Sequence, residues 1–148
     1  MVRPFQELDV WQAAHAHALD IYEVTKRFPT EERYGLVSQM RRAAVSVPAN
    51  IAEGSVRGDA EFRQFLRVAL GSASEVEYFL ILSRDLGYLS SEQARVLIEP
   101  LKSVKRRLVS FRNSLQPADS DGQPKAKGQR PTARSASYQP SSAKRRPQ

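Results

Sequence analysis

Residues 39–54 read Gln-Met-Arg-Arg-Ala-Ala-Val-Ser-Val-Pro-Ala-Asn-Ile-Ala-Glu-Gly, and this stretch decides the fold class. Its apolar residues recur every three or four positions, which is the spacing of one face of a helix. Pro48 lacks an N–H and its ring clashes with the carbonyl of Ala44, so we predict a helix that bends between these two residues. The helix is expected to end at Gly54, because the absence of a Cβ suits a C-cap.

The same spacing outlines three further helices, over residues 7–28, 59–86 and 90–115. Pro29 ends the first of them, and Thr30, which is followed by two acidic residues, is expected to restart the chain as the second helix. Short connections make consecutive helices antiparallel neighbours. The sequence therefore predicts an all-α fold, an up-down antiparallel four-helix bundle.

The predicted ends of the third and fourth helices carry turn and capping residues. Asp59 is expected to cap the third helix, Gly87 to close it, and Ser90 or Ser91 to cap the fourth. Pro100 interrupts the fourth helix and predicts a second bend near Val96.

The third helix is apolar over a wider sector than the core of a single bundle requires. Phe65, Val68, Phe79 and Leu82 lie beside its main stripe, and Gly71 begins a run of small residues that would let another backbone approach closely. This surplus indicates a subunit interface, so we expect a homo-oligomer.

Composition sets the broad class. The chain has 148 residues, no cysteine and no long apolar segment, so we expect one soluble, cytoplasmic domain with no membrane span. Residues 116–148 carry seven Lys and Arg against two Asp and account for +5 of the net charge of +7. We expect residues 1–115 to form the bundle and 116–148 a disordered basic tail.

Catalytic and metal-binding patterns are missing from the sequence. His15 and His17 are two positions apart, so on a helix they point away from each other and cannot share a metal, and we interpret both as ordinary surface or interface residues. No phosphate-binding glycine loop or nucleophilic triad stands out. We expect neither enzymatic activity nor a cofactor.

A polar cluster in the opening stretch has a structural interpretation. Ser46, Asn50 and Glu53 are spaced to lie along one helix flank, where they can bond to one another and to carbonyls freed by the proline. We interpret the cluster as a joint that fixes the second helix against the third. Its members are Ser46, Pro48, Asn50, Glu53, Gly54 and Gly71.

Basic residues are the candidate binding groups. They accumulate in the second helix, the loop after it and the fourth helix, in numbers that would make several phosphate contacts if they lay together. Nothing resembles a base-reading motif, so binding would be electrostatic and not sequence-specific. The candidate nucleic-acid-binding residues are Arg41, Arg42, Arg57, Lys102, Lys105, Arg106 and Arg107.

Several ordered motifs carry a family resemblance. They are Phe5-Gln6-Glu7-Leu8 with Val10-Trp11, Phe28-Pro29 with Glu32-Arg33-Tyr34-Gly35-Leu36, the whole of residues 39–54, Ala69 to Glu77, and Leu86-Gly87-Tyr88. On these motifs, residues 3–115 resemble the four-helix-bundle proteins encoded by intervening sequences of bacterial 23S ribosomal RNA genes. The same family includes the accessory variability proteins of diversity-generating retroelements.

The resemblance implies a ring-like homopentamer with a basic surface that binds nucleic acid and a reverse transcriptase and has no catalytic activity of its own. The leading hypothesis is therefore a non-enzymatic oligomeric accessory protein that binds RNA or DNA and assists a reverse transcriptase. The alternative is a protein-interaction scaffold in which the basic residues only confer solubility.

Overall fold

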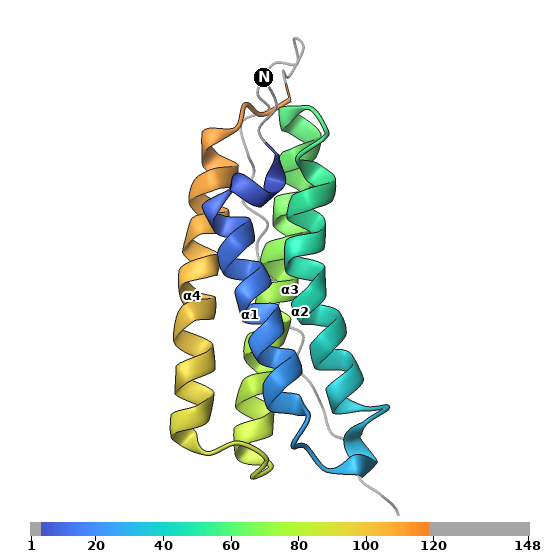
Figure 1. The fold of residues 1–148 in the computed structure, drawn as a ribbon. Helices are drawn as coiled ribbons and strands as arrows, with labels where there is room; N and C mark the ends of the chain where they lie inside the picture. The colour runs from blue at the N-terminus through green and yellow to red at the C-terminus, as the bar shows by residue number, and fades with distance from the viewer. Residues whose placement is uncertain (1–3, 119–148) are drawn as a thin grey trace, which may run out of the picture.

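The structure, a computed structural model, describes residues 4–118, and the tail proposed for residues 116–148 lies almost wholly outside them. Four helices form the fold: α1 (Asp9–Thr25), α2 (Leu36–Gly54), α3 (Asp59–Asp85) and α4 (Ser91–Ser114). Short 3-10 helices, η1 (Phe5–Glu7) and η2 (Thr30–Glu32), precede α1 and α2, and the described residues contain no strand. Figure 1 shows the helices running alternately down and up, as the sequence predicted.

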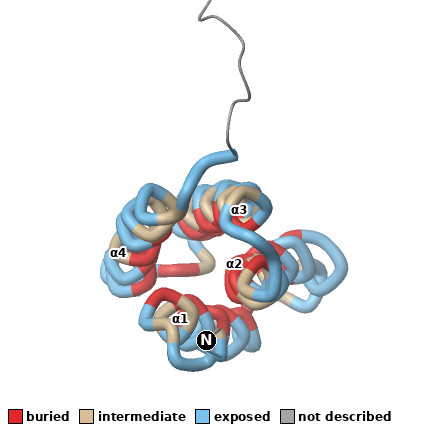
Figure 2. Tube along the Cα trace, turned by 90° about the horizontal axis from the view of Figure 1, so that it is seen from above, coloured by how far each residue is buried: buried red, intermediate tan, exposed pale blue. Residues whose placement is uncertain are grey.

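Each helix packs against two neighbours, and α4 closes the ring by contacting α1. Viewed along the bundle, the buried residues of all four helices face one central axis (Figure 2). The core contains the expected stripes, with Ile21, Met40, Leu66 and Leu101 almost fully buried. Removing this apolar surface from water is the main force that holds the four helices together.

The ends of the first two helices differ from the prediction. α1 begins at Asp9 and ends at Thr25, and Thr30 starts the 3-10 helix η2, while α2 begins only at Leu36. The physical reason is visible at Glu32, whose Oε2 accepts a hydrogen bond from the backbone N–H of Leu36 at 3.3 Å. A side chain four residues earlier thus supplies the acceptor that the first turn of α2 lacks.

Glu32 also closes the lower end of the bundle in Figure 1. The hydroxyl of Tyr88 donates to its other oxygen at 3.1 Å, and the Tyr88 ring packs against Phe28 with 5.5 Å between centroids. The α1–α2 connection and the α3–α4 connection are therefore joined to each other.

The caps of α3 and α4 were predicted in part. Gly87 has a positive φ of 81°, and the N–H groups of Gly87 and Tyr88 bond to the carbonyls of Arg84 and Ser83, which closes α3 in a Schellman motif. Ser90 caps α4 in a capping box with Gln93. Asp59 does not cap α3, because Gly58 occupies that position.

Both interior prolines lie within unbroken helices. Pro48 is buried in α2, and Pro100 is exposed on α4. The bends expected at the two prolines stay predictions.

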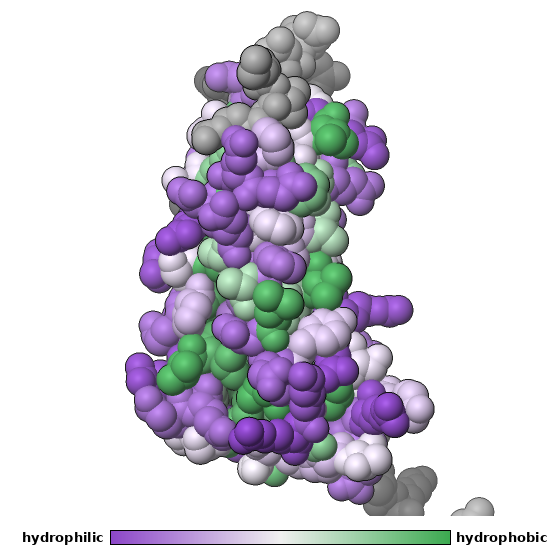
Figure 3. Space-filling model, viewed as in Figure 1, coloured by the Kyte–Doolittle hydropathy of each residue, from purple (hydrophilic) through white to green (hydrophobic). Residues whose placement is uncertain are grey.

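The face of the molecule seen in Figure 1 is covered mainly by hydrophilic residues, and hydrophobic residues form small patches between these (Figure 3). Across residues 4–118, none of the helices has both the length and the apolar character needed to cross a bilayer.

Candidate nucleic-acid interface

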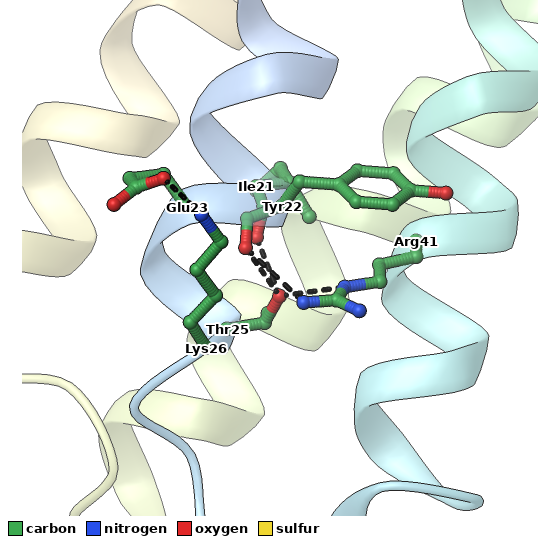
Figure 4. Close-up of polar contacts among 6 residues, drawn as sticks. All are labelled: Ile21, Tyr22, Glu23, Thr25, Lys26 and Arg41. Atoms are coloured by element: carbon green, nitrogen blue, oxygen red, sulfur yellow. Dashed lines mark hydrogen bonds and ion pairs between the residues drawn. The ribbon is translucent and has the colours of Figure 1, made fainter.

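Arg41 joins α2 to the end of α1 and is the best-positioned of the predicted binding residues. Its Nε donates to the Thr25 hydroxyl at 3.0 Å and its Nη2 to the Tyr22 carbonyl at 3.2 Å (Figure 4). The guanidinium lies over the Tyr22 ring, 4.7 Å from the centroid. These contacts fix the orientation of the cation without neutralising it, since neither acceptor carries a charge.

A shallow groove surrounds this arginine, which we call the tyrosine–arginine groove. Arg33 and Arg42 are exposed beside Arg41, and within residues 4–118 none of the three forms an ion pair with a carboxylate. Arg33 lies over the ring of Tyr34, which is 89% exposed. The lining residues are Tyr22, Arg33, Tyr34, Val37, Ser38, Arg41 and Arg42.

This arrangement combines two elements of nucleic-acid recognition. Guanidinium groups bind phosphate oxygens in a bidentate manner, and exposed tyrosine rings provide faces on which unpaired bases stack. Tyr22, Arg33 and Tyr34 were not among the predicted site residues. Arg33 and Tyr34 stood within one of the quoted motifs, but neither the periodicity nor the charge count assigned them a role, because only the fold brings them beside Arg41.

Arg57 lies in a different environment. It forms ion pairs with Glu53 at 3.6 Å and Glu61 at 3.3 Å, and it packs over the Phe65 ring. These two carboxylates balance its charge. Arg57 also lies in the α2–α3 connection, which is at the other end of the bundle from the tyrosine–arginine groove (Figure 1).

The basic residues of α4 are divided among separate surroundings. Lys102 pairs with Glu99 on the same helix at 3.7 Å, and Lys105 with Glu77 on α3 at 2.9 Å. Arg106 is exposed without an ion-pair partner in the described part of the chain, while Arg107 lines a hollow between α4 and the start of α1. The seven predicted residues therefore do not form one surface.

The polar cluster of α2 is confirmed for Ser46 and Asn50 but not for Glu53. The Asn50 side-chain amide donates to the Ser46 carbonyl at 2.7 Å and to the Ser46 hydroxyl at 2.9 Å. That hydroxyl also bonds to Ser72 on α3 at 2.8 Å, which links the two helices. Glu53 does not join them, because it faces Arg57 instead.

The two glycines of the proposed joint differ from each other. A Cβ on Gly54 would lie 2.5 Å from Phe62 and 2.7 Å from the Cβ of Phe65, so a close approach of α3 requires glycine here. α2 ends at Gly54 as predicted, but Ser55 is its C-cap, and the only positive-φ glycine among the described residues is Gly87. Gly71 has open space around it, and no backbone approaches it within the subunit.

His17 is buried, contrary to its interpretation as a surface or interface residue. Its Nε2 lies 2.8 Å from the carbonyl of Leu97 on α4, so the neutral ring donates from this nitrogen. Burial lowers the pKa of His17 below its ordinary value of 6.5, against the opposing effects of the Leu97 hydrogen bond and the Asp20 charge. Exposed His15 stacks on Trp11 with 4.9 Å between ring centroids. Over residues 4–118, no three His, Asp or Glu side chains are grouped as metal ligands would be.

Comparisons with known proteins agree with this architecture. The model of the family described as 23S rRNA-intervening sequence protein matches residues 6–110. The chain belongs to this family. A crystal structure of a protein of unknown function from the S23 ribosomal protein family of Bacteroides thetaiotaomicron is 26% identical, with a TM-score of 0.66. That similarity covers 71% of this chain and 99% of the solved one. No curated protein sequence matches significantly.

Contacts at the lower end of the bundle account for several residues of the motifs that resemble the 23S rRNA-intervening sequence protein family. Phe28, Glu32 and Tyr88 come from different motifs of the sequence, and they meet in the contacts that join the two lower connections. These residues are thus explained by folding, whereas the exposed Arg33 and Tyr34 beside them are not.

Proposed function

We propose that this protein is a non-enzymatic, homo-oligomeric accessory protein that binds RNA or DNA through the tyrosine–arginine groove. The observation that carries the proposal is the placement of Arg33, Arg41 and Arg42, which have no carboxylate partner in residues 4–118, beside the exposed rings of Tyr22 and Tyr34. Arginine fixes phosphates and tyrosine stacks on bases, so the expected ligand is a single-stranded segment or loop.

Recognition in such a groove depends on charge and stacking. Among the described residues that line it, none has a side-chain amide or carboxylate that would read a base edge. Binding is therefore sequence-tolerant and weakens with salt, because each neutralised phosphate releases condensed counterions.

The physiological role that we propose is assistance to a reverse transcriptase in a diversity-generating retroelement. Its support is the family to which the chain belongs and the resemblance of its motifs to the accessory variability proteins. A reverse transcriptase gene beside a repeated variable template in the same genomic neighbourhood would support this role, and their absence would favour a role outside retroelements.

Self-association is proposed on a stripe of α3 that the subunit leaves uncovered. Val68, Tyr78 and Leu86 are each about half exposed and are spaced to lie along one face with Gly71. Phe65, Phe79 and Leu82, which also suggested an interface, are partly buried within the subunit. Light scattering should give a multiple of the 16.6 kDa subunit mass, five for the ring that the resemblance implies, and a monomer at micromolar concentration would contradict the proposal.

Nucleic-acid binding is tested by fluorescence anisotropy with a labelled single-stranded RNA at low and moderate salt. The Arg33→Glu/Arg42→Glu double variant removes two exposed cations that hold no structural contact beyond the Tyr34 ring. We expect affinity to fall by at least about tenfold, and the slope of log affinity against log salt to become shallower by about 1.5. Arg41 is left unchanged, because its bonds to α1 would confound binding with stability.

Two further variants separate charge from stacking. Arg84→Glu/Arg95→Glu makes the same change of charge on exposed arginines outside the groove, and its affinity should stay within about threefold of the parent. Tyr34→Ala should weaken binding to single-stranded RNA by about 1–3 kcal/mol while leaving the salt slope unchanged. Equal losses in the two double variants, or no binding by the parent at low salt, would sink the proposal.

The scaffold alternative is favoured by one observation. A hollow lies between α1 and α4, on the other side of α1 from the tyrosine–arginine groove, and its described lining includes Asp20, Glu23 and Glu92. Glu23 and Glu92 pair with Lys26 and Arg95, whereas Asp20 forms no ion pair in residues 4–118. A second copy of the chain could place a cation beside Asp20, so that this hollow contributes to self-association. Asp20→Lys should then reduce the oligomer mass in light scattering, whereas under nucleic-acid binding it leaves RNA affinity intact.

A further inference from the structure

A second basic cleft lies at the opposite end of the bundle, between the start of α3 and the end of α4. Arg63, Arg67 and Arg112 line it, together with Ala60, Gln64 and Ala118. None of the lining residues that the structure describes is acidic. Asp59 precedes Ala60 but lies outside the lining, and its carboxylate accepts a hydrogen bond from the backbone N–H of Gln116.

The fold explains only one of the three arginines. Nη1 of Arg63 donates to the carbonyl oxygens of Arg112 and Leu115, at 2.6 and 3.0 Å, and so satisfies backbone groups at the end of α4. Arg67 is exposed, and in the described part of the chain it forms no ion pair and no hydrogen bond through its side chain. The cleft thus carries positive charge that no carboxylate of the described residues balances.

Arg112, the third lining arginine, also has hydrogen-bonding capacity that the described residues leave unsatisfied. Its Nε is buried from solvent and has no hydrogen-bond acceptor, and it is the one side-chain nitrogen or oxygen in residues 4–118 left in that state. Buried donors are normally paired, because the loss of water is otherwise uncompensated. Arg41, the comparable half-buried arginine on α2, bonds through its Nε to Thr25.

The chemistry of the cleft selects the ligand. Arginine forks on two different helices face one space, and the first turn of α3 adds the positive end of a helix dipole at Ala60. A planar carboxylate occupies one fork, whereas the tetrahedral oxygens of a phosphate can accept from guanidinium groups on both helices at once. We propose that this cleft binds a phosphate group between Arg67 of α3 and Arg112 of α4, with Arg63 behind it.

The same chemistry is offered by inorganic phosphate and by the phosphodiester groups of a nucleic acid. The cleft is separate from the tyrosine–arginine groove, so the inference does not rest on the proposed function. The groove is lined by residues near the start of α2 and the cleft by residues near the start of α3, and Figure 1 shows these two helix starts at opposite ends of the bundle.

The test uses the full-length chain and follows the side-chain Nε–Hε signals of arginine by NMR. Inorganic phosphate is titrated in one arm and a short single-stranded oligonucleotide without terminal phosphates in the other, each against chloride at equal ionic strength. We expect the Arg112 signal to shift in at least one arm. A shift in both arms supports a general phosphate site, a shift with phosphate alone supports the free ion as ligand, and a shift with the oligonucleotide alone supports phosphodiester binding. No shift in either arm overturns the inference.

Two matched variants distinguish a specific phosphate site from nonspecific electrostatic attraction of phosphate to the protein. Arg67→Gln removes an exposed arginine without disturbing the core, and it should raise the Kd of the bound phosphate by about tenfold, the effect of one lost charge-assisted hydrogen bond. Arg84→Gln, an exposed arginine on the same helix, should leave the Kd unchanged. An equal effect of both variants would overturn the inference. Arg33→Glu/Arg42→Glu should leave phosphate binding at this cleft intact, so failure of one proposal does not imply failure of the other.

Discussion

Gly54 and Gly71 form a matched pair in which the same substitution should have opposite effects on stability. Replacing glycine by alanine within a helix gains about 1 kcal/mol from helix propensity alone. At Gly71 the new Cβ meets no atom within 4 Å, so most of this gain should appear as added stability. At Gly54 it meets Phe62 at 2.5 Å and Phe65 at 2.7 Å.

The clash at Gly54 is large enough to reverse the sign. Carbon atoms in contact lie about 3.5–4.0 Å apart, so the added methyl overlaps its neighbours by about 1 Å. The Cβ of Phe65 is fixed by the backbone of α3, and the Phe62 ring is held edge-on against Phe111 with 5.2 Å between centroids. The two helices would have to separate, and overpacking of this kind costs about 1–3 kcal/mol. Since the propensity gain of about 1 kcal/mol offsets part of this cost, we expect Gly54→Ala to destabilise the fold by up to about 2 kcal/mol.

Thermal unfolding followed by circular dichroism measures both effects at one protein concentration. For a bundle of this size, 1 kcal/mol corresponds to a shift in Tm of about 4 °C. Gly71→Ala should raise the Tm by about 2–4 °C, and Gly54→Ala should lower it by up to about 8 °C. Gly71 lies on the proposed self-association stripe, so the oligomer mass of each variant is measured by light scattering on the same samples. A rise in Tm for Gly54→Ala, or a fall for Gly71→Ala at an unchanged mass, would refute the reasoning from local packing.

Three further predictions concern ionisable contacts. Burial lowers the pKa of His17, so the folded protein holds this side chain neutral. The free energy of unfolding should therefore fall as the pH drops below 6.5, because the unfolded chain then takes up a proton that the folded chain does not. Urea titration should show a weaker pH dependence in His17→Gln. Lys105→Met breaks the ion pair with Glu77, whose side chains are only 27% and 21% exposed, and should lower the free energy of unfolding by about 1 kcal/mol. Lys102→Met breaks the exposed pair with Glu99 and should lower it by less than about 0.5 kcal/mol. Equal losses would contradict the role of burial. The hydrogen bond to Glu32 raises the pKa of Tyr88 above its ordinary value of 10.0, so Glu32→Gln should lower that pKa in an NMR titration of labelled tyrosine, and an unchanged pKa would exclude the contact.

The sequence predicted the architecture because the apolar residues that recur every three or four positions along each helix are the residues that the core buries. Met40, Leu66 and Leu101 stand on stripes that the spacing alone identifies, and all three are in the core. Gly87 and Ser90 were assigned correctly because capping depends on local chemistry.

Errors arose where a residue's role depends on another segment. Glu32 accepts the N–H of Leu36 at the start of α2, while its other oxygen accepts a hydrogen bond from Tyr88 in the α3–α4 connection. His17 is buried because α4 lies against that side of α1. Gly54 was interpreted as a cap from its position, but glycine is required there because two phenylalanines of α3 leave no room for a Cβ.

Charge counting was least informative about the candidate site. It gave equal weight to Lys105, which forms an ion pair with another helix, and to Arg42, which is exposed and unpaired in the described residues. It also passed over Arg33, which lies outside the predicted basic segments. Side-chain pairing, and not the number of basic residues, distinguishes a cation that stabilises the fold from one that is free to bind.

The two hydrogen bonds of Glu32 have a consequence for how the bundle assembles. One carboxylate accepts from the first amide of α2 and from a tyrosine that is 56 residues away in the sequence. The start of one helix hairpin is thereby linked to the turn of the other, so opening either connection weakens the other as well. Such a link favours a single cooperative folding unit over two hairpins that open independently.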